Sequence, residues 1–154
     1  MALGQGDLLV TPIQLSVYIH KIATSGETFI PHFDLNKTPE PVSKIILKNQ
    51  TWAKIQNYLF NTANSINGTG IAANPKINGL KVYGKTGTAQ NPHGDDHAWF
   101  TGYAEKDEKM VSIVLLIENG GSGGKIAAPL ASDAFEYIFY NNSHRIVNNV
   151  ENSI

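Results

Sequence analysis

The segment Gly84-Lys85-Thr86-Gly87-Thr88 gathers a lysine, two hydroxyl groups and two glycines within five residues. If it forms a β-strand, Lys85 and Gly87 lie on one face and Thr86 and Thr88 on the other. A lysine beside hydroxyl groups suits an anion such as a carboxylate, and Gly87 lets another backbone come close. The pattern also fits a plain strand whose polar residues face solvent, because short motifs recur by chance.

A second group of side chains could bind a metal ion. His93, Asp95, Asp96 and His97 supply nitrogen and oxygen ligands of the kind that zinc accepts. They stand in a polar stretch between two expected strands, which favours a solvated loop. We therefore predict no metal site and no cofactor.

Three helices and three strands are expected to position these residues. Thr11 caps the first helix, with Pro12 at its first position, and Gly26 stops it. Thr51 is expected to cap a second helix over residues 52–63. The connections between the strands are short, which predicts an antiparallel meander. The third strand is apolar on both faces, so helices should cover both sides of the sheet. The strands are expected at residues 82–89, 97–104 and 111–118, and the last helix at residues 128–140.

Length and composition narrow the class of protein. The chain has 154 residues, the size of one domain. Its net charge is −1 and no basic stripe is visible, so nucleic-acid binding is not indicated. The absence of cysteine excludes disulfides and thiolate metal sites. We find no signal peptide and no apolar run long enough to span a membrane.

Four segments together resemble the class B penicillin-binding proteins, the peptidoglycan transpeptidases of the bacterial cell wall, and cover residues 4–140 in the family's order. The likeness is nearest to the elongation-type, penicillin-binding protein 2-like members. It implies an α/β (α+β) fold of the transpeptidase and serine β-lactamase type, with three antiparallel strands flanked by helices. The segments are Gly4-Gln5-Gly6 with residues 9–15, Asn67-Gly68-Thr69-Gly70, residues 84–90, and residues 118–123 with Ala127-Ala128-Pro129.

The resemblance also implies roles for individual residues. Family members use a Ser-x-x-Lys helix start, a Ser-x-Asn loop and the Lys-Thr-Gly strand. By likeness, Lys85 sets the electrostatics around the nucleophilic serine, and Thr86, Gly87 and Thr88 bind the stem peptide or the carboxylate of a β-lactam. The backbone N–H of Thr88 is one of two oxyanion-hole donors.

The first two family motifs are expected on the N-terminal side of this segment, so two local matches are rejected. Ser122-Gly123-Gly124-Lys125 fits Ser-x-x-Lys, but two glycines form poor helix and the match follows the strand motif. Ser65-Ile66-Asn67 fits Ser-x-Asn, but we expect it to form a turn.

Three interpretations of the chain remain open. Residues 1–140 form the C-terminal part of a transpeptidase domain, inactive alone, with residues 141–154 as a polar tail. Alternatively, the chain is a non-catalytic peptide-binding or scaffold module, or a fragment without independent function. We expect association with the other half of the domain or with itself, because an edge strand or apolar face is exposed. By likeness, the parent protein is anchored in the cell envelope on its periplasmic face.

Overall fold

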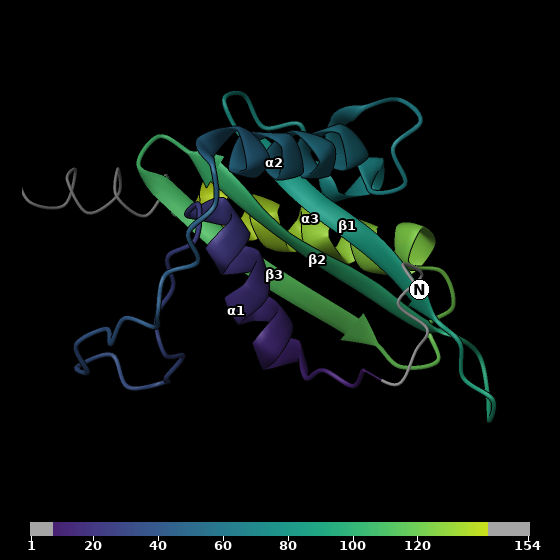
Figure 1. Cartoon of the computed structure of the whole chain (residues 1–154). Coiled ribbons are helices and arrows are strands. Elements are labelled where there is room, and N and C mark those ends of the chain that lie inside the picture. The colour runs from purple at the N-terminus through teal and green to yellow at the C-terminus, as the bar shows by residue number, and fades with distance from the viewer. Residues whose placement is uncertain (1–7, 142–154) are drawn as a thin grey trace, which may run out of the picture.

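The structure is a computed structural model that describes residues 8–141, and Figure 1 shows how its elements are arranged. The Gly4-Gln5-Gly6 segment and the polar tail from residue 142 onward lie outside the described residues. Three α-helices, three strands and three short helical turns follow one another along the described chain. In order they are α1 (Pro12–Ala23), α2 (Asn49–Asn64), η1 (Ile71–Ala73), β1 (Lys81–Ala89), β2 (His97–Lys106), β3 (Lys109–Ile117), η2 (Gly123–Ala127), α3 (Ala128–Glu136) and η3 (Tyr137–Asn141).

The three strands form one antiparallel sheet in the order β1-β2-β3. This confirms the meander that the short connections predict. In the β1–β2 register, Lys85 lies opposite Thr101 and Ala89 lies opposite His97. Only two residues join β2 to β3, and Asp107 there has a φ of 54°, a conformation that aspartate tolerates in tight hairpins. Within the described residues, β1 and β3 are therefore the outer strands.

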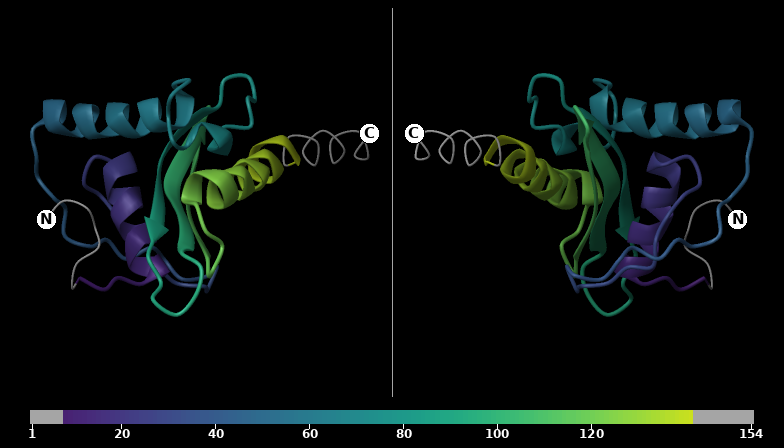
Figure 2. Two further views of the ribbon diagram at one scale, coloured as in Figure 1. Left: turned by 90° about the vertical axis from the view of Figure 1, so that its right-hand side faces the viewer. Right: turned by 90° about the vertical axis from the view of Figure 1, so that its left-hand side faces the viewer.

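Helices cover both faces of the sheet, as the apolar third strand predicts. Figure 2 shows α1 and α2 on one side and α3 on the other. On the α1/α2 face, the buried core consists of Ile19, Ile22, Trp52 and Tyr103. On the α3 face, Phe100 of β2 packs in one cluster with helix residues that include Phe135. The sheet is thus the middle layer of three, and each face of β1 has a different environment.

Thr11 begins α1 as the sequence predicts. The backbone N–H of Gln14 donates to Thr11 Oγ1 at 3.3 Å, and the backbone N–H of Thr11 donates to Gln14 Oε1 at 2.8 Å. Each residue satisfies one backbone donor that the helix itself leaves open, which is the reciprocal arrangement of a capping box. The predicted start of the second helix was wrong. Helix α2 begins at Asn49 after Lys48, without a side-chain cap, so Thr51 lies inside its first turn.

These two threonines make a matched pair. We expect Thr11→Ala to lower the free energy of unfolding by about 1 kcal/mol, because the hydroxyl that accepts from the N–H of Gln14 is lost. Thr51→Ala should change it by less than about 0.5 kcal/mol, since no cap depends on that hydroxyl. Urea unfolding followed by circular dichroism measures both. An equal loss in the two variants would contradict the assignment of the cap.

The glycine-rich segment after β3 is more ordered than the sequence indicates. Instead of a flexible loop through Gly124, helical turn η2 starts at Gly123 and runs directly into α3. A methyl group on Gly123 would lie 2.2 Å from the carbonyl oxygen of Gly87 and 2.5 Å from that of Trp99. The glycine is therefore required by close packing against the sheet, and its low helix propensity is overridden by that tertiary contact.

Candidate functional site

The Lys85–Thr88 segment lies in the second half of outer strand β1, where the sequence places it. Lys85 and Thr88 are exposed, and Thr86 and Gly87 are partly buried. The ammonium group of Lys85 donates to the carbonyl oxygen of Thr86 at 2.7 Å. The strand therefore presents a positive charge beside an outer backbone edge of the described sheet.

The two threonines are each connected to another glycine-bearing segment. Thr86 Oγ1 donates to Thr69 Oγ1 at 3.0 Å, so the Asn67–Gly70 segment reaches the strand. The backbone N–H of Gly123 donates to Thr88 Oγ1 at 3.3 Å. Three of the segments that carry the family likeness thus meet around β1, although the two contacts join residues that are 17 and 35 positions apart in sequence.

Lys85 faces an apolar groove between α1, α2 and the sheet. The groove has a volume of about 410 Å³. Its lining is mainly aliphatic and aromatic, and among the described lining residues Lys85 alone is charged at neutral pH. The lining residues are Leu15, Tyr18, Ile19, Ile22, Ile55, Leu59, Lys85, Thr86, Gly87, Trp99 and Thr101. An apolar surface with a lysine at its sheet side can bind an apolar group that carries a negative charge.

Neither rejected serine lies in this groove. Ser65 ends α2, and its carbonyl oxygen accepts a hydrogen bond from the N–H of Gly68, which is the predicted turn. One reason for rejecting Ser122 was wrong, because Ser122 directly precedes a helical turn that includes Lys125. Yet Gly123, the next residue, packs beside Thr88, on the face of β1 opposite to Lys85. The second reason, its order along the chain, is unaffected.

The loop with His93, Asp95 and Asp96 is tied to the segment after β3. The backbone N–H of Asn119 donates to His97 Nδ1 at 2.9 Å, and Asn91 Nδ2 donates to Asn119 Oδ1 at 2.7 Å. Among residues 8–141, no three histidine or acidic side chains are close enough to hold a metal ion. Sequence reasoning found the polar loop but missed Asn119, which holds it.

A tyrosine pair beneath α2 was also missed. Tyr83 and Tyr103 are register partners whose ring centroids lie 4.4 Å apart with an interplanar angle of 7°. The hydroxyl group of Tyr83 donates to Glu105 Oε1 at 2.8 Å. Burial first, and then this carboxylate, raises the pKa of Tyr83 well above its ordinary value. Burial likewise raises the pKa of Tyr103. Both phenols therefore stay protonated at neutral pH and act as packing groups.

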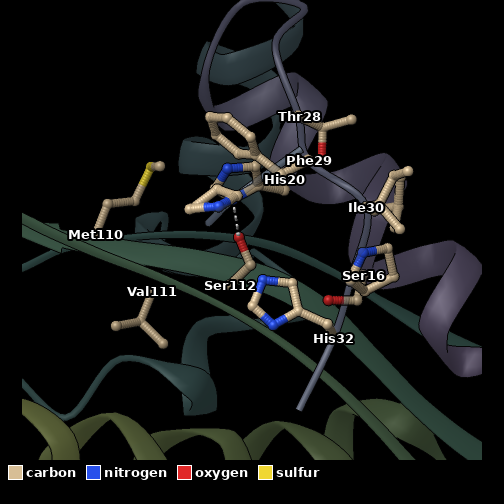
Figure 3. A pocket seen from close by; sticks show the side chains of 12 residues that line it. Ser16, His20, Thr28, Phe29, Ile30, His32, Met110, Val111 and Ser112 are labelled. Atoms are coloured by element: carbon tan, nitrogen blue, oxygen red, sulfur yellow. Dashed lines mark hydrogen bonds between the residues drawn. The ribbon is translucent and has the colours of Figure 1, made fainter. Parts of the chain in front are cut away.

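A second pocket of about 460 Å³ lies on the other side of α1, against the start of β3 (Figure 3). His20 Nδ1 lies 3.4 Å from Ser112 Oγ, and His32 and Ser16 lie near them in the same view. Burial lowers the pKa of His20. Its imidazole therefore stays neutral in the folded chain at a pH where it begins to take up a proton in the unfolded chain.

This difference has a measurable consequence for stability. Because the unfolded state binds more protons, the contribution of His20 is complete above about pH 6.5 and falls as the pH drops below that value. We expect the urea midpoint to decrease between about pH 7 and pH 5, and the decrease to be smaller in His20→Gln. An unchanged slope in His20→Gln would contradict the prediction.

The fold and the site define a class of protein. An antiparallel sheet between helical layers, with a Lys-Thr-Gly-Thr segment on an outer strand, is the arrangement expected of a penicillin-recognising transpeptidase. The sequence matches the transpeptidase family, described as the penicillin binding protein transpeptidase domain, over residues 1–136. The chain therefore belongs to this family, and the predicted class B, penicillin-binding protein 2-like identity is confirmed by its relatives.

Three relatives illustrate the likeness. The peptidoglycan D,D-transpeptidase MrdA of Haemophilus influenzae is 31% identical, over 89% of this chain and 25% of its own length. Penicillin-binding protein PBP2 of Helicobacter pylori, solved in complex with MreC, has a TM-score of 0.72 and 27% identity, covering 89% of this chain and 26% of that one. Penicillin-binding protein A of Mycobacterium tuberculosis, solved as a ceftriaxone acyl-enzyme complex, has a TM-score of 0.64 and 25% identity, covering 86% and 33%. The chain thus spans about a quarter to a third of the length of these relatives.

Proposed function

We propose that this chain is the C-terminal part of a peptidoglycan D,D-transpeptidase domain and supplies its substrate-binding strand. The observation that carries the proposal is the position of Lys85, on an outer strand and facing an apolar groove. Family membership and the relatives named peptidoglycan D,D-transpeptidase support it. We infer that the nucleophilic serine is supplied by a segment outside this chain; the family likeness, which places the Ser-x-x-Lys motif on the N-terminal side of the Lys-Thr-Gly strand, supports this.

The chain's own residues would bind and polarise the acyl donor. An extended peptide can pair with the backbone of outer strand β1, which gives affinity through main-chain hydrogen bonds. Lys85 stabilises a nearby carboxylate or developing negative charge. Thr86 adds a hydroxyl group to the same edge. The backbone N–H of Thr88 is assigned, on the family likeness, to the oxyanion that forms when the serine oxygen attacks the donor carbonyl.

The groove also indicates which partner the chain binds. Its aliphatic lining is suited to an apolar helix, and we assign it to the other half of the transpeptidase domain. Further large apolar side chains are exposed, including Leu8, Leu9 and Ile46. Without that half, the chain is expected to self-associate, which size-exclusion chromatography can detect. The complete protein would work in the cell envelope, where its substrate, the peptidoglycan stem peptide, is found, and would bind β-lactams. No helix among residues 8–141 is long and apolar enough to cross a membrane.

The absence of a groove serine also favours a second function, a module that binds carboxylate-bearing peptides without catalysis. The mass of the intact chain after incubation with excess benzylpenicillin tests both ideas. We expect no change in mass for the chain alone, and one penicillin adduct once the other half of the domain is supplied. No adduct in the completed domain would favour the binding module. An adduct on the chain alone would overturn the assignment of the serine, and Ser122→Ala and Ser65→Ala would identify its site.

A further inference from the structure

Asn119 connects two loops at one end of the sheet. Its backbone N–H donates to His97 Nδ1 at 2.9 Å, and its side-chain oxygen accepts from Asn91 Nδ2 at 2.7 Å. A third bond, from the N–H of Gly121 to the carbonyl oxygen of Asp96 at 2.7 Å, joins the same two loops. The φ of Asn119 is 53°, in the left-handed region that asparagine and glycine adopt more readily than other residues. The β1–β2 loop, residues 90–96, is therefore bonded near both its ends.

This attachment lies next to the Lys85–Thr88 strand. His97 is the register partner of Ala89, the residue after Thr88. The segment that carries Asn119 continues to Gly123, whose N–H donates to Thr88 Oγ1. Figure 1 shows the β1–β2 loop and the connection after β3 at the same end of the sheet. A peptide paired along β1 advances about 3.3 Å per residue, so one that passes Thr88 reaches this loop within about two residues.

We propose that Asn119 and His97 are positioning residues that hold the β1–β2 loop as a wall at the end of the substrate strand. The wall contacts the part of an extended, carboxylate-bearing peptide that continues beyond Thr88. This inference rests on the proposed function of β1 as a peptide-binding strand. The three hydrogen bonds give the loop one position, so its polar side chains reach the peptide without first being ordered.

The bond to His97 has a specific chemical signature. Nδ1 accepts this hydrogen bond through the lone pair of a ring nitrogen that carries no proton. The ionisable groups in the segments around His97 are His93, Asp95 and Asp96 in the loop and Glu118 beside Asn119, while its register partner on β1 is the neutral Ala89. The bond therefore requires Nδ1 of His97 to face Asn119 as an acceptor, which an ordinary packing contact would not require.

Hydrogen exchange of the 154-residue chain tests the attachment. Asn119→Gly keeps the left-handed backbone and the N–H but removes the oxygen that binds Asn91. We expect amide exchange in residues 90–96 to rise about five- to tenfold, the effect of one hydrogen bond, and Asn119→Asp to restore the wild-type rate. His97→Phe removes the ring nitrogen that accepts from Asn119 and should raise exchange in the same residues. Unchanged exchange in Asn119→Gly, or in His97→Phe, would overturn the attachment.

Peptide binding tests whether the β1–β2 loop contacts the substrate. Amide chemical shifts of the same chain are followed while a short peptide ending in D-alanyl-D-alanine is added. We expect shifts in residues 85–88 and also in 90–96, with weaker binding in Asn119→Gly and recovery in Asn119→Asp. Shifts confined to residues 85–88 would contradict the proposed contact between the wall and the peptide, and would leave the proposed function intact. No shifts in either segment would remove the proposed function, and the wall with it.

Discussion

Replacing Phe100 with alanine is expected to lower the free energy of unfolding by about 3–5 kcal/mol, the range typical of buried Phe→Ala changes. Phe100 has no solvent exposure and lies in the core on the α3 face. Phe33 is the matched control, because its side chain is fully exposed and Phe33→Ala should change stability by less than about 0.5 kcal/mol. Urea unfolding with an unchanged m-value measures both.

Contacts with two glycines explain why substitutions around Phe100 should lower stability. A methyl group on Gly84 would lie 2.3 Å from the Phe100 ring, and one on Gly102 would lie 2.8 Å from it. The two glycines thus leave the space that the ring fills. Gly84→Ala alone should be destabilising through overpacking. In the Phe100→Ala background the same change should cost much less, because the clashing ring is gone. Additive effects of the two substitutions would contradict this direct contact.

Local signals were sufficient to predict the elements of the fold. The hydroxyl of Thr11 followed by Pro12 marks the start of α1, and the short connections give the antiparallel order of the strands. The start of α2 was missed because Lys48 caps it without a side-chain hydrogen bond. Gly123 was assigned to a loop from its propensity, whereas its conformation is set by backbone groups more than twenty residues away. Such contacts leave no periodic signal in the sequence.

The candidate site, too, was only partly predictable from the sequence. Lys85 and the threonines after it were identified because the motif is contiguous and alternation fixes its faces. The hydrogen bond from Thr86 to Thr69 and the groove facing Lys85 depend on how α1, α2 and β1 pack, so the motif alone could not reveal them. Asn119 was missed for the same reason, since its partners Asn91 and His97 are more than twenty residues away.

The largest functional effect is expected at Lys85. In the transpeptidase domain completed by its other half, Lys85→Met should slow acylation by benzylpenicillin by about 10²–10³-fold, the size of effect seen when one oxyanion-stabilising donor is removed. Methionine keeps an apolar stem against the groove but removes the charge that attracts the carboxylate. Lys85→Arg keeps the charge and should retain more of the rate, although its planar group cannot reproduce the geometry of the ammonium.

Lys81 provides the control for this experiment, because it lies on the same strand and, by alternation, on the same face. Its ammonium group is 3.8 Å from Glu105 and, unlike Lys85, it does not line the groove. Lys81→Met should therefore acylate at the wild-type rate. The rate is followed by the mass of the adduct over time at several concentrations of penicillin, which separates initial binding from acylation. Equal losses in Lys81→Met and Lys85→Met would show a general effect of strand charge. Loss in Lys85→Met alone would place the ammonium of Lys85 beside the reacting group.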